Sequence, residues 1–137
     1  MNRTSIVLAV VRCGAQICLA RRSHSVATSR GLWSAVTGYL EPATDPLTQA
    51  WTELWEELGL RAPGINLVRS LPPVPLTSPG SAKDFLVYPF LFETDRPRRP
   101  VLNWEHDDVQ WAAPSRLKLP DCVDWQLPLV RALLADT

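Results

Sequence analysis

Apolar residues form several short extended runs along the chain. Residues 4–11 are apolar and β-branched nearly throughout, a pattern typical of a strand buried on both faces. After a turn at residues 13–15, a second strand is predicted at residues 16–21. Composition and alternation predict further strands at residues 32–39, 65–71, 83–93 and 109–112.

A helical period replaces the extended pattern at residues 46–58. Asp45 is a suitable N-cap, Pro46 fits the first helical position, and Gly59 suits the left-handed residue that ends a helix. The apolar positions recur at the spacing of a buried stripe: Leu47, Trp51, Leu54 and Leu58. The capping residues and the stripe therefore predict the same helix.

A second helix is predicted at residues 124–134, where Leu127, Val130, Leu133 and Leu134 share one side. Prolines mark a loop at residues 72–80 and a basic turn at residues 95–100. Pro89 lies inside a predicted strand, which indicates an edge or a bulge. Strands before and after a central helix, with a last helix to cover them, predict an α+β or α/β sandwich.

Composition narrows the class of protein. A chain of 137 residues with 46% hydrophobic content is expected to form a single domain over residues 1–137. The formal net charge is zero, which argues against a broad electrostatic grip on nucleic acid. The apolar run at residues 6–11 is too short for a membrane span.

The cysteines and histidines suggest no structural metal site. Cys13, Cys18 and Cys122 are odd in number and contain no C-x-x-C pair, so three reduced thiols in a cytoplasmic protein are expected. Two histidines, His24 and His106, are too few for a histidine-based metal site.

Three glutamates gather on the predicted helix at residues 46–58. With about 100° per residue, Glu53, Glu56 and Glu57 fall within one narrow arc, where their like charges repel. A hard divalent cation bound by their oxygens would compensate this repulsion. A solvated acidic face is the alternative, and the helix pattern alone does not decide between the two.

The stretch from Gly38 to Leu60 resembles the Nudix box, whose pattern is G-x5-E-x7-R-E-U-x-E-E-x-G-U with U aliphatic. The matching residues stand in register without insertion or deletion: Gly38, Glu53, Leu54, Glu56, Glu57, Gly59 and Leu60. Thr44 replaces the first glutamate of the pattern, and Thr52 replaces its arginine. Upstream, Trp33 and Glu41 also resemble the approach to the box in this family.

The resemblance implies an α/β Nudix fold, with a mixed sheet between helices. It also implies a hydrolase that cleaves the pyrophosphate bond of a nucleoside diphosphate linked to another moiety, with Mg²⁺ or Mn²⁺ as cofactor. Glu53, Glu56 and Glu57 would then be metal ligands and catalytic residues, with the backbone of Gly38 as a further contributor. The cation would neutralise the diphosphate and acidify an attacking water.

The resemblance places a general base either in the box or on a later loop. In residues 103–108, Glu105 is the preferred candidate and Asp108 the second, against the alternative of a solvated acidic turn. His106 in the same loop is expected to titrate near neutral pH.

Several residues are candidates for binding the substrate. Arg21, Arg22 and Lys83 could contact a phosphate or sugar, or be ordinary surface charges. Tyr39 and Trp104 could stack on a base, or belong to the core. The partner implied is a small nucleotide-type molecule, not a membrane or nucleic acid, and a homodimer stays open.

The two threonines of the box leave other functions open. In the family pattern the glutamate and arginine that they replace support the first metal-binding carboxylate, so a weakened or inactive module that binds a nucleotide or protein is the alternative to an enzyme. A threonine hydroxyl could still hydrogen-bond Glu53. A diphosphate isomerase would need a catalytic cysteine, and no cysteine here stands in a recognisable motif.

Overall fold

The computed structural model describes residues 3–77, 84–117 and 121–135. Their strands form one eight-stranded mixed sheet, with order β3-β2-β1-β7-β5 and with β4, β6 and β8 pairing to β1, β7 and β2. The strands are β1 (Arg3–Cys13), β2 (Gln16–Arg22), β3 (Trp33–Ser34), β4 (Val36–Tyr39), β5 (Asn66–Ser70), β6 (Val74–Thr77), β7 (Asp84–Glu93) and β8 (His106–Ala112). The helices are α1 (Pro46–Leu58) and α2 (Gln126–Leu134), with a 3-10 turn at Pro114–Arg116.

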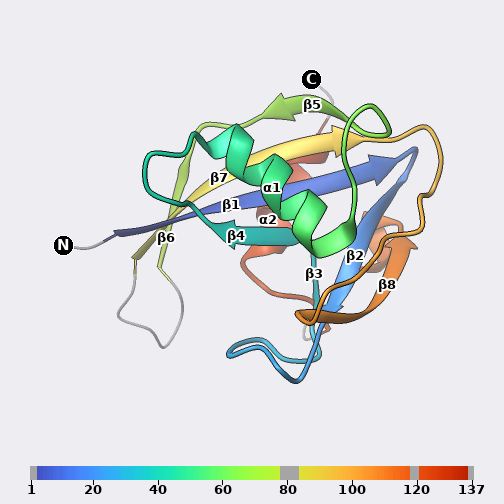
Figure 1. Ribbon diagram of the computed structural model, residues 1–137, viewed down its shortest axis with the longest axis horizontal. Helices are drawn as coiled ribbons and strands as arrows, with labels where there is room; N and C mark the ends of the chain where they lie inside the picture. The colour runs from blue at the N-terminus through green and yellow to red at the C-terminus, as the bar shows by residue number, and fades with distance from the viewer. Residues whose placement is uncertain (1–2, 78–83, 118–120, 136–137) are drawn as a thin grey trace.

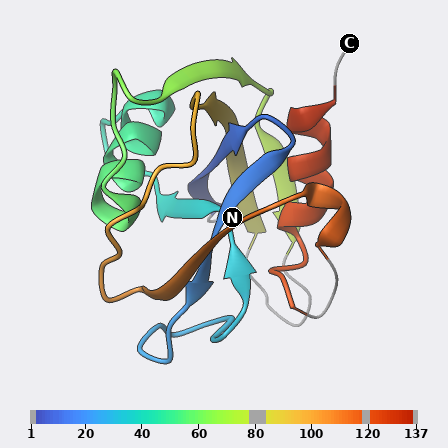
Figure 2. The same ribbon diagram turned by 90° about the vertical axis from the view of Figure 1, so that its right-hand side faces the viewer.

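The two helices cover opposite faces of this sheet, which confirms the predicted α/β sandwich (Figures 1 and 2). The central strand β1 runs parallel to β7 from Arg3 to Arg12, and its middle is buried, as its apolar run predicts. Alternate residues of β1 enter two separate cores. Val7, Ala9 and Val11 lie under α1, whereas Ile6, Leu8 and Val10 lie on the side of α2.

Helix α1 has the predicted bounds and caps. The Asp45 side chain accepts hydrogen bonds from the backbone N–H groups of Leu47 and Thr48, and Gly59 ends the helix with a left-handed φ of 67°. Leu54 and Leu58 are fully buried in the core beneath the helix. Leu47 and Trp51 pack against the same core, so the predicted stripe is confirmed.

Three expectations for the strands need correction. The segment 72–80 is not a loop throughout, because β6 forms an edge strand there, and an edge tolerates its Pro75. Residues 32–39 form two short strands, since β3 pairs with β2 and β4 with β1. Strand β8 begins at His106 rather than at residue 109, so the second half of the predicted acidic loop is extended.

Two further expectations differ in detail. Pro89 is neither at an edge nor in a bulge of β7. It is buried where the neighbour of β7 changes, because Val87 pairs with Val74 of β6 and Phe90 with Ser70 of β5. Helix α2 begins at Gln126, two residues later than predicted.

The three cysteines are not joined in disulfides, as predicted. Cys18 is buried, and this burial raises the pKa of its thiol to about 12. No helix among the described residues is long and apolar enough to cross a membrane.

Candidate active site

The carboxylate of Glu53 lies against the backbone of Gly38. Strand β4 carries Gly38 opposite Val7 of β1, and α1 crosses over this strand. A Cβ added at Gly38 would lie 2.1 Å from the Glu53 Cδ atom and 2.3 Å from its Oε1 atom. Only a glycine therefore leaves room for this carboxylate, which is a specific reason for Gly38 beyond turn formation.

A buried glutamine holds the same carboxylate from the helix side. Gln49 Nε2 donates to Glu53 Oε1 over 3.0 Å, one helical turn along α1. The backbone N–H of Glu41 donates to Gln49 Oε1 over 3.1 Å, and only 3% of Gln49 is exposed. Glu53 is thus fixed by Gly38 on one side and by the Gln49 amide on another.

Glu57 forms the buried floor of the cluster. Its Oε1 atom lies 3.8 Å from Nε2 of His106, the first residue of β8, and both side chains are almost inaccessible. In the described part of the chain, Glu57 Oε2 and His106 Nδ1 have no hydrogen-bond partner. A buried carboxylate oxygen without a partner is costly in a fold and is a recurrent feature of functional sites.

The protonation states follow from this burial. Burial, the hydrogen bond with Glu53 and the charge of Glu105 raise the pKa of Glu57 well above its usual value. Burial also raises the pKa of Glu53, although its hydrogen bonds with Glu57 and Gln49 act in the opposite direction. The carboxyl group of Glu57 therefore gives up its proton less readily than an ordinary glutamate does.

His106 does not titrate near neutral pH as its sequence position suggests. Burial and the charge of Arg22 lower the pKa of its imidazole to about 4, only partly offset by Asp107. The imidazole is therefore uncharged near neutral pH, and its contact with Glu57 is not an ion pair.

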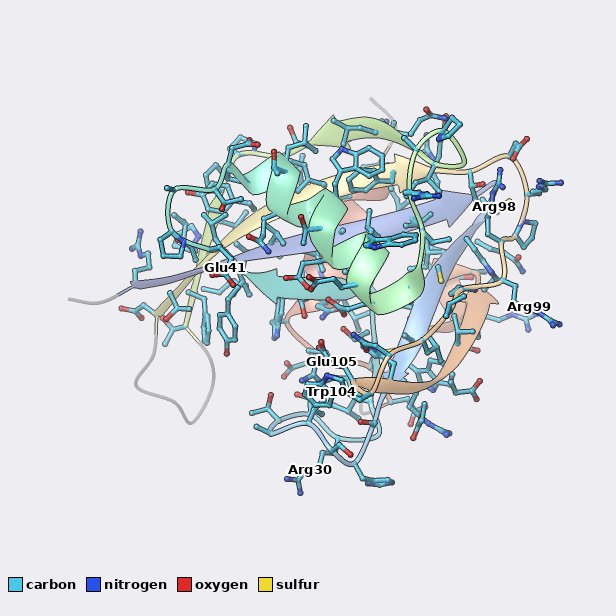
Figure 3. The ribbon with its side chains drawn as sticks, viewed as in Figure 1. Arg30, Glu41, Arg98, Arg99, Trp104 and Glu105 are labelled. Atoms are coloured by element: carbon cyan, nitrogen blue, oxygen red, sulfur yellow. The ribbon has the colours of Figure 1, made fainter. Side chains whose placement is uncertain are left out.

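Glu105 joins the cluster from the loop before β8, and Figure 3 shows it with Trp104 below the end of α1. Its charge contributes to raising the pKa of both Glu53 and Glu57. The loop is held in place by Ser23, whose Oγ donates to the Trp104 carbonyl and whose N–H donates to the Glu105 carbonyl, both over 2.8 Å. The half-buried Glu105 side chain is thus close enough to the box glutamates for its charge to act on two of them.

Glu56 differs from its two neighbours because it is exposed. Among residues 3–77, 84–117 and 121–135, no three acidic, histidine or cysteine side chains already converge as a complete metal-ligand set. The donor chemistry nevertheless fits a hard divalent cation, since Glu53 and Glu57 offer carboxylate oxygens and one of these lacks a protein partner. Packing does not fix Glu56 in one orientation.

The hydroxyl groups of the two box threonines do not donate to Glu53. The Thr52 hydroxyl donates to the Thr48 carbonyl, and the Thr44 hydroxyl donates to the Pro42 carbonyl. A hydrogen bond from a threonine hydroxyl to Glu53, which the sequence left possible, is therefore not formed. Gln49, which no motif position marks, makes that contact instead. Its spacing of four residues from Glu53 was the only sequence signal for this pairing.

The substrate-binding candidates have different surroundings. Arg21 donates to Asp107 over 2.7 Å and lies over the Trp33 ring, so its charge is already engaged. Arg22 donates to the Thr28 carbonyl, and its charge reaches Glu57 and His106. Lys83 lies outside the described residues.

The two aromatic candidates are not core residues, because Tyr39 is 66% and Trp104 65% exposed. Tyr39 directly follows Gly38 on β4, and Trp104 directly precedes Glu105. Tyr39 is therefore next in sequence to the glycine that accommodates Glu53, and Trp104 is next to Glu105.

Comparisons with known proteins bear on the family and the fold. The family model of the NUDIX domain matches residues 1–133. No curated protein sequence matches the chain. The solved structure of the E. coli ORF135 protein is similar with 21% identity and a TM-score of 0.72, covering 98% of this chain and 90% of that one.

Two further solved structures are similar. The MutT protein from Methanosarcina mazei Go1 has 18% identity and a TM-score of 0.75, covering 97% of this chain and 95% of that one. The E. coli dihydroneopterin triphosphate pyrophosphohydrolase has 17% identity and a TM-score of 0.75, covering 95% and 94%. At these identities the structures show a shared fold.

Proposed function

The chain belongs to the NUDIX domain family and is a pyrophosphohydrolase, and from this premise we propose that it hydrolyses a nucleoside diphosphate linked to another moiety, with Mg²⁺ or Mn²⁺ as cofactor. The observation that carries the proposal is the buried carboxyl group of Glu57. It lies beside Glu53, and one of its oxygens has no partner within the described residues. Burying a carboxyl group without a hydrogen-bond partner costs free energy, and binding a cation there would explain why the group is buried.

The ligands in this proposal are the carboxylates of Glu53, Glu56 and Glu57, and the Gly38 backbone is a further contributor. When bound, the cation neutralises the diphosphate and acidifies an attacking water. Gly38 and Gln49 keep the Glu53 carboxylate in place. Glu57 would hold the cation as an ionised carboxylate, because the cation would stabilise its charge.

Glu105 is proposed as the general base. It is half-buried, its charge acts on both Glu53 and Glu57, and its loop is anchored to Ser23. The second candidate, Asp108, is exposed on β8, where its carboxylate accepts from the N–H of Val109. Glu105 is therefore better placed to take a proton from a water held at the cluster.

The exposed rings and one arginine support a nucleotide-type substrate. Tyr39 and Trp104 present apolar surface that a base can cover by stacking. The charge of Arg22 is close enough to lower the pKa values of the buried His106 and Glu57, so it can also attract a phosphate.

The test is hydrolysis of a panel of nucleoside diphosphate derivatives and nucleoside triphosphates, measured by phosphate or monophosphate release with Mg²⁺, Mn²⁺ or EDTA. We expect turnover of one substrate class with either cation and none with EDTA. Binding of Mn²⁺ without turnover of any substrate would instead favour the alternative, a module that binds a nucleotide or protein. Absence of Mn²⁺ binding would refute the cation site.

Replacing the proposed base Glu105 should reduce the rate of hydrolysis more than it reduces the affinity for the metal ion. For Glu105→Gln we expect kcat to fall about 10²-fold, since general bases contribute about 10²–10⁴-fold. The Mn²⁺ affinity should change less than kcat, because Glu105 is not a proposed ligand and acts on Glu53 and Glu57 only through its charge. Asp108→Asn is the matched control, and a larger loss of kcat in that variant would move the base to Asp108.

A further inference from the structure

Gln49 stands between the loop before α1 and the carboxylate of Glu53. It lies in the first turns of α1, where its own N–H donates to the Asp45 carbonyl. Its side chain is buried at 3% exposure, although a glutamine amide needs several hydrogen-bond partners. It finds them in the Glu41 N–H and in Glu53 Oε1.

These partners determine which way the amide points. A backbone N–H can only donate, so the atom of Gln49 that faces Glu41 must be the oxygen. The Nε2 group is then directed at the Glu53 carboxylate as a donor over 3.0 Å. Rotating the amide by half a turn would place donor against donor and acceptor against acceptor, so neighbouring groups fix the orientation.

The direction of this hydrogen bond suits a ligand carboxylate. A donor aimed at Oε1 favours the ionised form of Glu53, the form that binds a cation. The bond leaves Oε2 of that carboxylate to other partners. The same carboxylate fits against the backbone of Gly38 because this residue has no Cβ atom, so the amide donor and the glycine together define its position.

We propose that Gln49 is a positioning residue that holds the Glu53 carboxylate for cation binding, in place of the glutamate and arginine that Thr44 and Thr52 replace. Both threonine hydroxyls donate to backbone carbonyls of other residues, so neither supplies this support. The inference rests on the proposed function, because it assigns a task to Gln49 only if Glu53 is a ligand.

The first measurement is Mn²⁺ affinity of the full chain, followed by the signal of unbound Mn²⁺ in electron paramagnetic resonance. For Gln49→Met, a nearly isosteric change that removes the amide, we expect about 10- to 100-fold weaker binding, the range for residues that orient a metal ligand. Gln16→Met is the matched control, because Gln16 is exposed at the start of β2. Its affinity should equal that of the wild type.

A second variant tests whether Gln49 positions Glu53 or only holds the loop before α1 in place. Gln49→Glu keeps an acceptor for the Glu41 N–H and replaces the donor facing Glu53 with a repelling carboxylate. We expect kcat at saturating Mn²⁺ to fall at least about tenfold, by the same reasoning. This variant also decides the matter if Gln49→Met does not fold.

The outcomes are distinguishable. Wild-type Mn²⁺ affinity in a folded Gln49→Met variant, or wild-type kcat in Gln49→Glu, would overturn the positioning role and leave the proposed function intact. Failure of the wild-type protein to bind Mn²⁺ would overturn the proposed function and this inference together.

Discussion

The Glu57→Gln variant should be nearly inactive and yet more stable than the wild type without metal. A metal ion that stabilises transition-state charge is worth several kcal/mol, and each 1.36 kcal/mol is tenfold in rate, so we expect kcat/KM to fall about 10³-fold. In EDTA the melting temperature should rise by several degrees, because a neutral amide removes the cost of burying an ionisable group.

The pH dependence of this gain has a definite sign. Glu57 has a raised pKa in the folded protein, so the native state holds its proton more tightly than the unfolded chain does. The contribution of Glu57 to the free energy of unfolding is fully present below the pKa of the unfolded chain, about 4.3. It is lost as pH rises through the pKa of Glu57 in the folded protein. The advantage of Glu57→Gln in EDTA should therefore be larger at pH 8 than at pH 5.

His106 has the opposite dependence, since its lowered pKa makes the fold gain stability as pH rises from about 4 through the unfolded value. This contribution is present in both proteins and cancels in their difference. Melting scans of the wild type and Glu57→Gln at both pH values, with EDTA and with saturating Mn²⁺, check the prediction. Saturating Mn²⁺ should reduce or reverse the advantage, because only the wild type gains from binding.

Glu56→Gln provides the control. Glu56 is exposed, so its replacement should leave the melting temperature in EDTA unchanged and still reduce turnover strongly. If both variants hydrolysed substrate at the wild-type rate, the metal-ligand assignment would be wrong. If the melting temperature of Glu57→Gln in EDTA equalled that of the wild type, burial of the Glu57 carboxyl group would not destabilise the metal-free protein.

Local chemistry explains why α1 was predictable from sequence. Asp45, Pro46 and Gly59 define its ends through contacts within a few residues, and the stripe of Leu54 and Leu58 repeats at the helical period. The same holds for β1, whose apolar run requires cover on both faces. Spacing could therefore predict where the three glutamates lie along the helix.

Spacing could not predict how unequal those glutamates are. Whether a carboxylate is buried depends on what the sheet places beside it, and His106 reaches Glu57 from a strand far along the chain. The extent of β8 was missed for the same reason, because its first residues pair with Arg21 and Arg22 across a bulge instead of showing a strand pattern of their own. Gln49 was missed because its second partner is a backbone N–H, which no side-chain motif records.

Gly38→Ala should disable the site with little harm to the fold. The added methyl group would lie 2.1 Å from Glu53 Cδ and 2.5 Å from its Cγ, so the Glu53 side chain must leave its place. Glu53 is half-buried and can turn towards solvent, which relieves the clash at the expense of the hydrogen bond from Gln49. We expect kcat/KM to fall about 10²- to 10³-fold, a loss like that of a missing ligand.

The stability of this variant should change by less than the 1–3 kcal/mol typical of overpacked cores, because the clashing group is a side-chain end and not backbone. Gly64→Ala is the control, since its nearest contacts are 3.3 Å away, at the Arg61 carbonyl and the Arg98 side chain. That variant should retain full turnover and Mn²⁺ affinity.

The decisive measurement for Gly38 is a double-mutant cycle with Glu53→Ala. If Gly38 serves to make room for the Glu53 carboxylate, either change removes the same ligand, and the double variant should lose no more Mn²⁺ affinity or kcat/KM than Glu53→Ala alone. If the effects multiplied, Gly38 would act independently of Glu53, for example through its own backbone. Such a result would mean that Gly38 acts through its backbone carbonyl and not by making room for the Glu53 side chain.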